Sequence, residues 1–280
     1  MIVGVIGSGA MGSGIAQSFA SNNFRVLLHD ISDKMLSKAL NTIDKSLNRM
    51  VNKGTITKDI AVNCIENITT SISIDVMVDC DLIIEAATEN IDIKKKIFRD
   101  LDALVKADCI LASNTSSISI NELADATSRI EKVIGMHFMN PVPIMKLVEV
   151  IKTTRTSDKT VKMIIDTALK LGKHPVECVD SPGFISNRVL MPMINEAIYS
   201  LMEEVATKEA IDEIMTLGMS HPMGPLTLAD LIGLDVCLSI LNVLKEGFNN
   251  NPKYEPCPLL VDMCKQGKLG RKTGEGFYRY

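Results

Sequence analysis

The spacing of hydrophobic residues changes several times near the start of the chain, and each change predicts a new strand or helix. Residues 2–6 form a short run of mostly β-branched side chains, and residues 25–29 form a second run ending at Asp30. Short apolar runs bounded by glycine or polar residues are typical of buried strands. Between the two runs, apolar side chains in residues 15–20 recur at helical spacing. The pattern predicts strand, glycine turn, helix and strand.

The following hundred residues alternate between helical and strand-like spacing. Residues 32–53 have apolar side chains at a period near 3.6, which predicts a long amphipathic helix with a polar, basic face. Later apolar runs cover residues 82–86, 110–112, 133–136 and 147–151, with helical segments that include 91–105 and 160–171. This alternation predicts an α/β fold with a Rossmann-type, doubly wound and mainly parallel sheet.

The periodicity changes after Ser181-Pro182-Gly183, where helical spacing replaces strand-like runs. A chain of 280 residues also suggests about two domains. We therefore expect a Rossmann-like domain over residues 1–182 and a smaller all-α domain over residues 183–280. The second domain is rich in methionine and has a small core, so packing against another copy of the chain would bury more apolar surface.

The amino-acid composition disfavours several classes of binding partner and of cellular location. The net charge of -4 disfavours a nucleic-acid binder, which needs clustered basic residues. No apolar stretch approaches the about 20 residues that span a bilayer, and no signal peptide is evident. The seven cysteines are scattered without a C-x-x-C pair, which indicates reduced thiols and a cytoplasmic protein. The four histidines show no metal-ligand spacing, so we expect no metal.

A glycine motif follows the first predicted strand and opens the first predicted helix. Gly7, Gly9 and Gly12 fit G-x-G-x-x-G, in which missing side chains allow a tight turn and close approach of backbone to pyrophosphate. Asp30, at the end of the second predicted strand, can accept hydrogen bonds from a ribose and repel a 2′-phosphate. Because the motif, the strands, the helix and the aspartate occur together, the pattern favours NAD over NADP as the ligand. It also disfavours the alternative explanation, a glycine turn without a ligand beside a solvated aspartate.

His137 is the most informative histidine because it follows an apolar strand and precedes a turn with two prolines. Glu149 lies on the next predicted strand, so a chain reversal could bring the carboxylate beside the imidazole. Histidine titrates near neutral pH, at about 6.5 when unperturbed, and can exchange a proton in either direction. From periodicity alone, however, a histidine at a strand end is more often structural.

Several motifs together resemble those of the 3-hydroxyacyl-CoA dehydrogenases. They are Ala-Ser-Asn-Thr-Ser-Ser at residues 112–117, His-Phe-Met-Asn-Pro-Val-Pro at 137–143, Ser-Pro-Gly-Phe-Ile-Ser-Asn-Arg at 181–188, His-Pro-Met-Gly-Pro-Leu at 221–226 with Asp230, Gly-Leu-Asp at 233–235, and Lys-Thr-Gly-Glu-Gly-Phe-Tyr at 272–278. The resemblance covers both expected domains and is highly specific.

The resemblance implies roles for five residues of the reaction site. His137 would be the catalytic acid/base and Glu149 its orienting partner. Ser116 and Asn187 would donate hydrogen bonds to the substrate oxygen, and Asn140 would position the histidine and the nicotinamide region. Neutral hydroxyl and amide donors suit a developing alkoxide, because they stabilise its charge without competing for the proton. Without the resemblance, turn or cap chemistry would explain Ser116 and Asn187.

The resemblance also implicates residues around the two ligands. Glu89, Lys94 and Lys272 match positions near the cofactor. Ser46 and Lys53, on the long helix of residues 32–53, match positions that contact coenzyme A, and a lysine suits its phosphates. A solvated helix face is the alternative explanation for Ser46 and Lys53.

The function implied is an NAD-dependent oxidoreductase that transfers hydride to and from C3 of a short-chain (S)-3-hydroxyacyl-CoA. It would interconvert 3-hydroxybutyryl-CoA and acetoacetyl-CoA, and the resemblance further implies a homodimer or larger homo-oligomer. Two alternatives are a dehydrogenase of free 3-hydroxy acids and a non-catalytic NAD-binding protein. The last would normally have lost one of Ser116, His137, Glu149 or Asn187, whereas all four are present.

Overall fold

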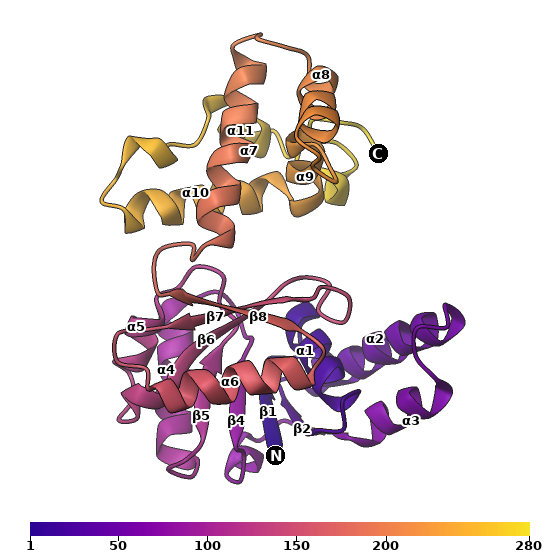
Figure 1. The fold of residues 1–280 in the computed structure, drawn as a ribbon, viewed down its shortest axis with the longest axis vertical. Coiled ribbons are helices and arrows are strands. Elements are labelled where there is room, and N and C mark those ends of the chain that lie inside the picture. The colour runs from indigo at the N-terminus through magenta and orange to yellow at the C-terminus, as the bar shows by residue number, and fades with distance from the viewer. The chain divides into compact units, whose positions relative to one another are not determined.

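The computed structural model describes residues 1–280, which form two compact units, Met1–Asp180 and Ser181–Tyr280. The first unit is a β-sheet with helices on both faces, and the second consists of helices (Figure 1). The change in hydrophobic period after residues 181–183 accounts for this difference. The predicted fold class, a Rossmann-type sheet followed by a smaller helical part, is confirmed.

The first unit contains one eight-stranded sheet in the order β3-β2-β1-β4-β5-β6-β7-β8. Its strands are β1 (Ile2–Ile6), β2 (Arg25–His29), β3 (Ile68–Ser71), β4 (Leu82–Glu85), β5 (Ile110–Ser113), β6 (Val133–Phe138), β7 (Leu147–Lys152) and β8 (His174–Val179). All neighbouring strands pair in parallel except β6 and β7, which are antiparallel. The carboxyl ends of β1, β2, β4 and β5 therefore share one edge of the sheet.

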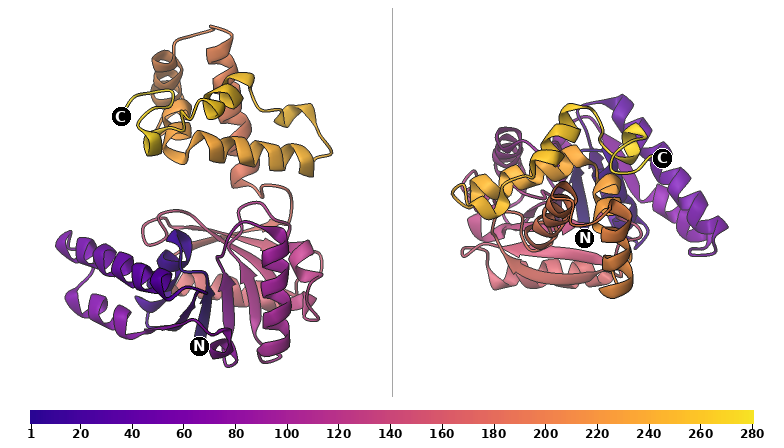
Figure 2. Two further views of the ribbon diagram at one scale, coloured as in Figure 1. Left: turned by 180° about the vertical axis from the view of Figure 1, so that it is seen from behind. Right: turned by 90° about the horizontal axis from the view of Figure 1, so that it is seen from above.

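The helices of the first unit cover both faces of the sheet. They are α1 (Ala10–Ala20), α2 (Asp33–Asn52), α3 (Lys58–Glu66), α4 (Ile91–Leu104), α5 (Ile120–Ala124) and α6 (Asp158–Lys170), with 3-10 turns η1 (Ile74–Met77) and η2 (Ile130–Lys132). α1 and α6 pack into the same core cluster, through residues such as Ile15 and Ile164. α6 lies in front of the sheet in Figure 1, and the reverse view in Figure 2 shows α4 on the opposite face.

The long helix α2 follows from its sequence pattern. Its buried side chains, Leu36, Ala39, Ile43 and Leu47, recur at helical spacing. The Ser32 hydroxyl caps the helix by accepting from the backbone N–H of residue 35, which satisfies one of the free donors of the first turn. The predicted range of residues 32–53 differs by one residue at each end.

Two strands of the sheet were not predicted, and both are edge strands. β8 has four exposed and two half-buried residues and begins His-Pro, while β3 has only four residues, none of them fully buried. Edge strands bury less apolar surface, so their sequences lack the continuous hydrophobic run that indicates a central strand. Only tertiary pairing with β7 and β2 reveals them.

The second unit is built from five α-helices and three short helical turns. It contains α7 (Ser186–Met202), α8 (Lys208–Glu213), the π-helical turn η3 (Ile214–Gly218), α9 (Pro225–Ile232), α10 (Leu234–Gly247), η4 (Pro252–Tyr254), α11 (Pro258–Lys265) and η5 (Arg271–Thr273). Its core includes Ile194, Leu226, Leu241 and Leu260. The buried Asp230 carboxylate holds the end of the chain by accepting the N–H groups of residues 277 and 278, both at 2.9 Å.

Apolar helices occur in this unit, but none has the dimensions of a membrane span. No single helix in the chain is both long and hydrophobic enough to cross a bilayer. α9 and α10 satisfy that test only when taken together, across a bend of 96°.

Candidate active site

The glycine motif that joins β1 to α1 requires glycine at two points, one in the turn and one in the first turn of the helix. Gly7 has φ of 94°, in the left-handed region that other residues rarely adopt. A Cβ atom at Gly12 would lie 1.8 Å from the Gly7 carbonyl oxygen. At Gly9, which precedes α1, a Cβ atom would meet nothing within 4 Å. The turn therefore leaves space beside the N–H groups that begin α1, where a pyrophosphate group fits.

The Asp30 carboxylate is fixed by the same turn. Ser8 donates its backbone N–H and its hydroxyl to Oδ2 at 2.9 and 2.7 Å, and the Ser32 N–H donates to Oδ1 at 3.1 Å. Burial raises the pKa of Asp30, but these hydrogen bonds outweigh it and hold the pKa below its usual value. An ionised carboxylate at this position repels a 2′-phosphate. The contact with Ser8 was missed because Ser8 occupies a variable position of the glycine motif.

A buried ion pair lies at the carboxyl end of β4. Lys94 Nζ contacts the two carboxylate oxygens of Glu85 at 2.6 and 2.8 Å, and both side chains are at most 1% exposed. The Ser113 hydroxyl also donates to Glu85, at 2.7 Å. Lys94 reaches Glu89 as well, with Nζ 3.5 Å from Oε2. The structure thus places the predicted cofactor residue Lys94 inside the unit, with Glu85 as its nearest charge.

Glu89 connects this ion pair to the loop that carries Ser116. Its Oε1 atom accepts from the Ser116 N–H at 3.0 Å and from the Ser117 hydroxyl at 3.1 Å, and the Thr115 hydroxyl donates to the same atom. Glu89 itself is exposed. Two predicted site residues that are distant in sequence, Glu89 and Ser116, are therefore in direct contact.

His137 and Glu149 face each other across the antiparallel strands β6 and β7. They are direct partners in the strand register, and His137 Nδ1 lies 2.8 Å from Glu149 Oε2. The two residues are 8% and 4% exposed, so little water reaches the contact. Because Nδ1 faces the carboxylate, the pair fixes the orientation of the imidazole ring. This arrangement supports proton transfer through the other ring nitrogen, Nε2.

Two asparagines flank the end of β6. The buried Asn114, directly after β5, accepts the Phe138 N–H at 2.9 Å and so links the Ser116 loop to the strand of His137. Asn140 is exposed and precedes a cis bond to Pro141. The role of Asn114 was missed because an asparagine in a loop gives no sequence signal of a specific backbone contact.

The residues predicted to contact coenzyme A lie on α2 and beside it. Ser46 is half-buried, and Lys53 is exposed at the C-terminal end of the helix. Other basic side chains on α2 include Lys45 and Arg49, both exposed. This face of the helix carries positive charge at its surface.

The remaining predicted site residues belong to the helical unit. Asn187 is in the first turn of α7, where its N–H donates to the carbonyl of Gly183 at 3.2 Å. Gly183 has φ of 71°, so the turn that precedes α7 requires a residue without a side chain. Lys272, in η5, forms an ion pair with Asp235 at 2.5 Å.

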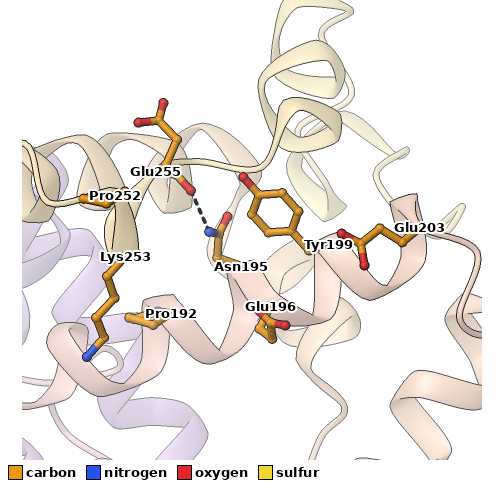
Figure 3. Close-up of a pocket in the computed structure, with 8 residues that line it drawn as sticks. All are labelled: Pro192, Asn195, Glu196, Tyr199, Glu203, Pro252, Lys253 and Glu255. Carbon is orange, nitrogen blue, oxygen red and sulfur yellow. Dashed lines mark hydrogen bonds between the residues drawn. The ribbon is translucent and has the colours of Figure 1, made fainter.

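A polar pocket of about 480 Å³ lies in the helical unit, and none of the predicted site residues lines it. It is formed by α7 and the segment around η4 (Figure 3), with the lining residues Pro192, Asn195, Glu196, Tyr199, Glu203, Pro252, Lys253 and Glu255. Asn195 donates to the Glu255 carbonyl at 2.8 Å and accepts the Cys257 N–H at 2.9 Å. These bonds fasten the η4 segment to α7, which is a structural role.

Neither a cluster of metal ligands nor a reactive thiol contributes to the candidate active site. No group of three or more His, Cys, Asp and Glu side chains is arranged to hold a metal ion. All seven cysteines are free thiols. Burial raises the pKa of several of them, to about 12 for Cys80, Cys109 and Cys237, which disfavours the reactive thiolate.

Comparison with known families covers nearly the whole chain. Residues 2–181 match the family described as "3-hydroxyacyl-CoA dehydrogenase, NAD binding domain", and residues 183–280 match "3-hydroxyacyl-CoA dehydrogenase, C-terminal domain". The chain belongs to the 3-hydroxyacyl-CoA dehydrogenase family. The resemblance predicted from the motifs is thereby confirmed, as is NAD as the cofactor of this dehydrogenase.

Individual relatives of this 3-hydroxyacyl-CoA dehydrogenase match over nearly their whole lengths. A probable 3-hydroxybutyryl-CoA dehydrogenase of Deinococcus radiodurans is 53% identical over 280 residues, all of both chains. The 3-hydroxybutyryl-CoA dehydrogenase of Bradyrhizobium diazoefficiens is 51% identical over 99% of this chain and 94% of its own. The crystal structure of (S)-3-hydroxybutyryl-CoA dehydrogenase from Ralstonia eutropha has a TM-score of 0.96 at 48% identity, covering 100% of this chain and 98% of that one.

Proposed function

We propose that the protein transfers hydride between NAD(H) and C3 of a short-chain (S)-3-hydroxyacyl-CoA, interconverting 3-hydroxybutyryl-CoA and acetoacetyl-CoA. The observation that carries the proposal is the buried contact between His137 and Glu149 in the NAD-binding unit. The names of relatives that are about 50% identical over 94% or more of their own length support the choice of acyl group.

The chain's own residues fit the cofactor. The turn at Gly7 and Gly12 admits no side chain, the start of α1 offers N–H donors, and the Asp30 carboxylate suits an unphosphorylated ribose. When bound, NAD supplies the carbon that accepts hydride from C3 of the alcohol. Glu89, Lys94, Lys272 and Asn140 complete the proposed cofactor site.

His137 is the proposed acid/base. In the oxidation, Nε2 removes the proton of the 3-hydroxyl as hydride leaves C3, and in the reduction it returns a proton to the carbonyl oxygen. Glu149, held at Nδ1, orients the ring and stabilises its protonated form. Since both residues are buried, this electrostatic contact is screened less than it would be in water.

Ser116 and Asn187 are the proposed donors to the substrate oxygen. Both side chains carry neutral donors, which stabilise a developing alkoxide without removing its proton. Glu89 and Asn114 hold the loop of Ser116 through backbone contacts. Asn187 belongs to the helical unit, in the first turn of α7.

The coenzyme A part of the substrate is proposed to contact Ser46 and Lys53. A hydroxyl and an ammonium group suit phosphate oxygens, and further positive charge on α2 would attract the same groups. A free 3-hydroxy acid would gain nothing from these contacts. Substrates with and without coenzyme A therefore distinguish the proposal from the alternative.

We also propose that the protein is a homodimer or larger homo-oligomer and acts in the cytoplasm. The helical unit exposes several large apolar side chains, among them Val189, Val205, Leu217 and Met219, between 61% and 82% exposed. Covering such exposed apolar side chains with a second copy of the chain removes them from water, which stabilises the assembly.

The direct test is a cofactor absorbance assay with the purified chain. Acetoacetyl-CoA should oxidise NADH, with NADPH a much poorer donor, and free acetoacetate should react at least about 100-fold less efficiently. A series of longer 3-ketoacyl-CoA esters then defines chain-length preference. Turnover of free acetoacetate as efficient as that of the thioester would overturn the substrate assignment.

A further inference from the structure

One lysine is buried in the NAD-binding unit with no carboxylate beside it. Lys173 is 8% exposed, and its Nζ donates to the backbone carbonyls of Val142 at 2.5 Å and Met145 at 2.8 Å. Burial lowers the pKa of this ammonium group below its ordinary value. A buried cation is costly unless it is well hydrogen-bonded, so the two carbonyl contacts offset part of an unfavourable burial.

The backbone of Lys173 is held rigidly at the end of α6. Gly172 has φ of 67° and donates its N–H to the Leu169 carbonyl at 2.9 Å, while the Lys173 N–H reaches the Ala168 carbonyl at 3.1 Å. This pair of bonds is the Schellman arrangement that ends many helices. The next residue begins β8, which pairs with β7. The lysine side chain therefore extends from a fixed point.

The two carbonyls bound by Lys173 belong to the segment that joins His137 to Glu149. This segment, residues 139–146, connects β6 to β7. Within it, the Pro141 carbonyl accepts the N–H groups of residues 144 and 145, both at 3.0 Å. Lys173 thus fixes the segment at two points, one nearer His137 and one nearer Glu149.

The same segment contacts the helix that follows the glycine turn. Val142 is 2% exposed, and a Cβ atom at Gly14 of α1 would lie 2.9 Å from the Val142 Cβ. The side chain of Val142 therefore packs directly against α1, while its carbonyl is held by Lys173. If this segment moved, α1, Asn140 and the strands β6 and β7, which carry His137 and Glu149, would be displaced with it.

We propose that Lys173 is a positioning residue for the reaction: it holds residues 139–146 so that His137, Glu149 and Asn140 keep their geometry relative to α1. The inference rests on the proposed function, because it assigns Lys173 to the site of that reaction. The lysine acts through backbone carbonyls and contacts no reacting atom.

Its removal has a specific physical consequence. A methionine at position 173 keeps most of the side-chain volume but leaves the Val142 and Met145 carbonyls without their donor. The segment then moves to find other donors, and small misplacements of a catalytic group are costly to rate. NADH affinity should change less than kcat, because the Gly7 and Asp30 contacts lie outside this segment and Asn140 is the one proposed cofactor residue within it.

The test compares Lys173→Met and Lys173→Gln with a matched control, Lys170→Met, in the full-length protein. Lys170 is exposed in the last turn of the same helix. Circular dichroism and thermal unfolding measure folding, NADH fluorescence measures cofactor affinity, and kcat, KM and the pH profile of kcat are measured with acetoacetyl-CoA. Rates are expressed per folded molecule.

We expect Lys173→Met to lower kcat about tenfold or more and to alter the pH profile, with NADH affinity within about threefold of the parent. Lys173→Gln, which keeps an amide donor, should recover part of the loss, and Lys170→Met should match the parent. If Lys173→Met does not fold, Lys173→Gln decides by the same kcat comparison. A parent-like kcat and pH profile in the folded variant would show that the lysine is only structural. An inactive parent enzyme would instead contradict the proposed function.

Discussion

Glu149 influences the proposed reaction only through His137, so its charge and its hydrogen bond can be separated by one substitution. Glu149→Gln keeps an oxygen that can accept from Nδ1 but removes the negative charge that stabilises a protonated ring. We expect kcat to fall by on the order of 100-fold while NADH affinity is retained. Steady-state kinetics with acetoacetyl-CoA and a fluorescence titration with NADH measure the two quantities.

The matched control for this substitution is Glu177→Gln. Glu177 lies on the adjacent strand β8 and pairs with Lys152 at the surface, at 2.5 Å. The control should keep parent-like turnover. Equal activity of the two variants would show that the buried carboxylate plays no part in the reaction.

At the level of residues, the sequence predicted the glycine turn and the place of Asp30 after β2, because each occupies a fixed position in a local strand, turn and helix pattern. Their contacts with the cofactor stay a prediction. The pairing of His137 with Glu149 needed the proline-containing reversal between two strands, which was also recognisable. Lys173 and Asn114 could not be found in this way. Their partners are backbone carbonyl and N–H groups of distant segments, and only the folded chain brings these together.

Among the elements, the end of α4 depends on an ion pair with residues that follow α5. Arg129 contacts Asp102 at 2.6 Å and also donates to backbone carbonyls at and beyond the helix end, including that of Val105 at 3.2 Å. The Ser128 N–H donates to the same aspartate at 2.7 Å. Burial raises the pKa of Asp102, but these hydrogen bonds outweigh it and lower the pKa overall.

A lowered pKa in the folded state gives a definite pH dependence. Ionised Asp102 stabilises the fold at pH above its unfolded pKa, about 3.9, and this contribution is lost as pH falls through the folded pKa. Asp102→Asn should therefore reduce the free energy of unfolding at pH 7 by about 1–3 kcal/mol. The difference from the parent should shrink towards pH 3, as measured by urea unfolding at both pH values.

Asp108→Asn provides the control, because Asp108 is 87% exposed and lies 3.3 Å from Lys132. Its effect on stability should stay below about 0.5 kcal/mol at either pH. A destabilisation by Asp102→Asn that is the same at pH 7 and pH 3 would contradict the electrostatic explanation.

The helices and strands differ in how far their local sequence predicts them. α2 has both a cap and a regular apolar stripe, so its limits were predicted to within one residue. The central strands were predicted because both of their faces are buried. β8 was missed because none of its residues is fully buried, and its place in the sheet depends on pairing with β7.

For the whole molecule, the exposed apolar side chains of the helical unit support self-association. We expect sedimentation equilibrium at micromolar concentration to give about twice the 30.6 kDa mass of one chain or a larger multiple. Leu217→Asp, at a residue that is 82% exposed, should weaken the association. Ile72→Asp, at a residue 62% exposed in the other unit, should not. A parent protein that sediments as a monomer would contradict this expectation.

The central claim is that His137 performs proton transfer in an NAD-dependent reaction on acetoacetyl-CoA. The most direct test measures NADH oxidation by the parent and by His137→Gln, together with NADH affinity for both. The account predicts clear turnover by the parent and a loss of at least about 100-fold in the variant, with NADH affinity within a few-fold. Turnover by His137→Gln close to that of the parent would contradict it.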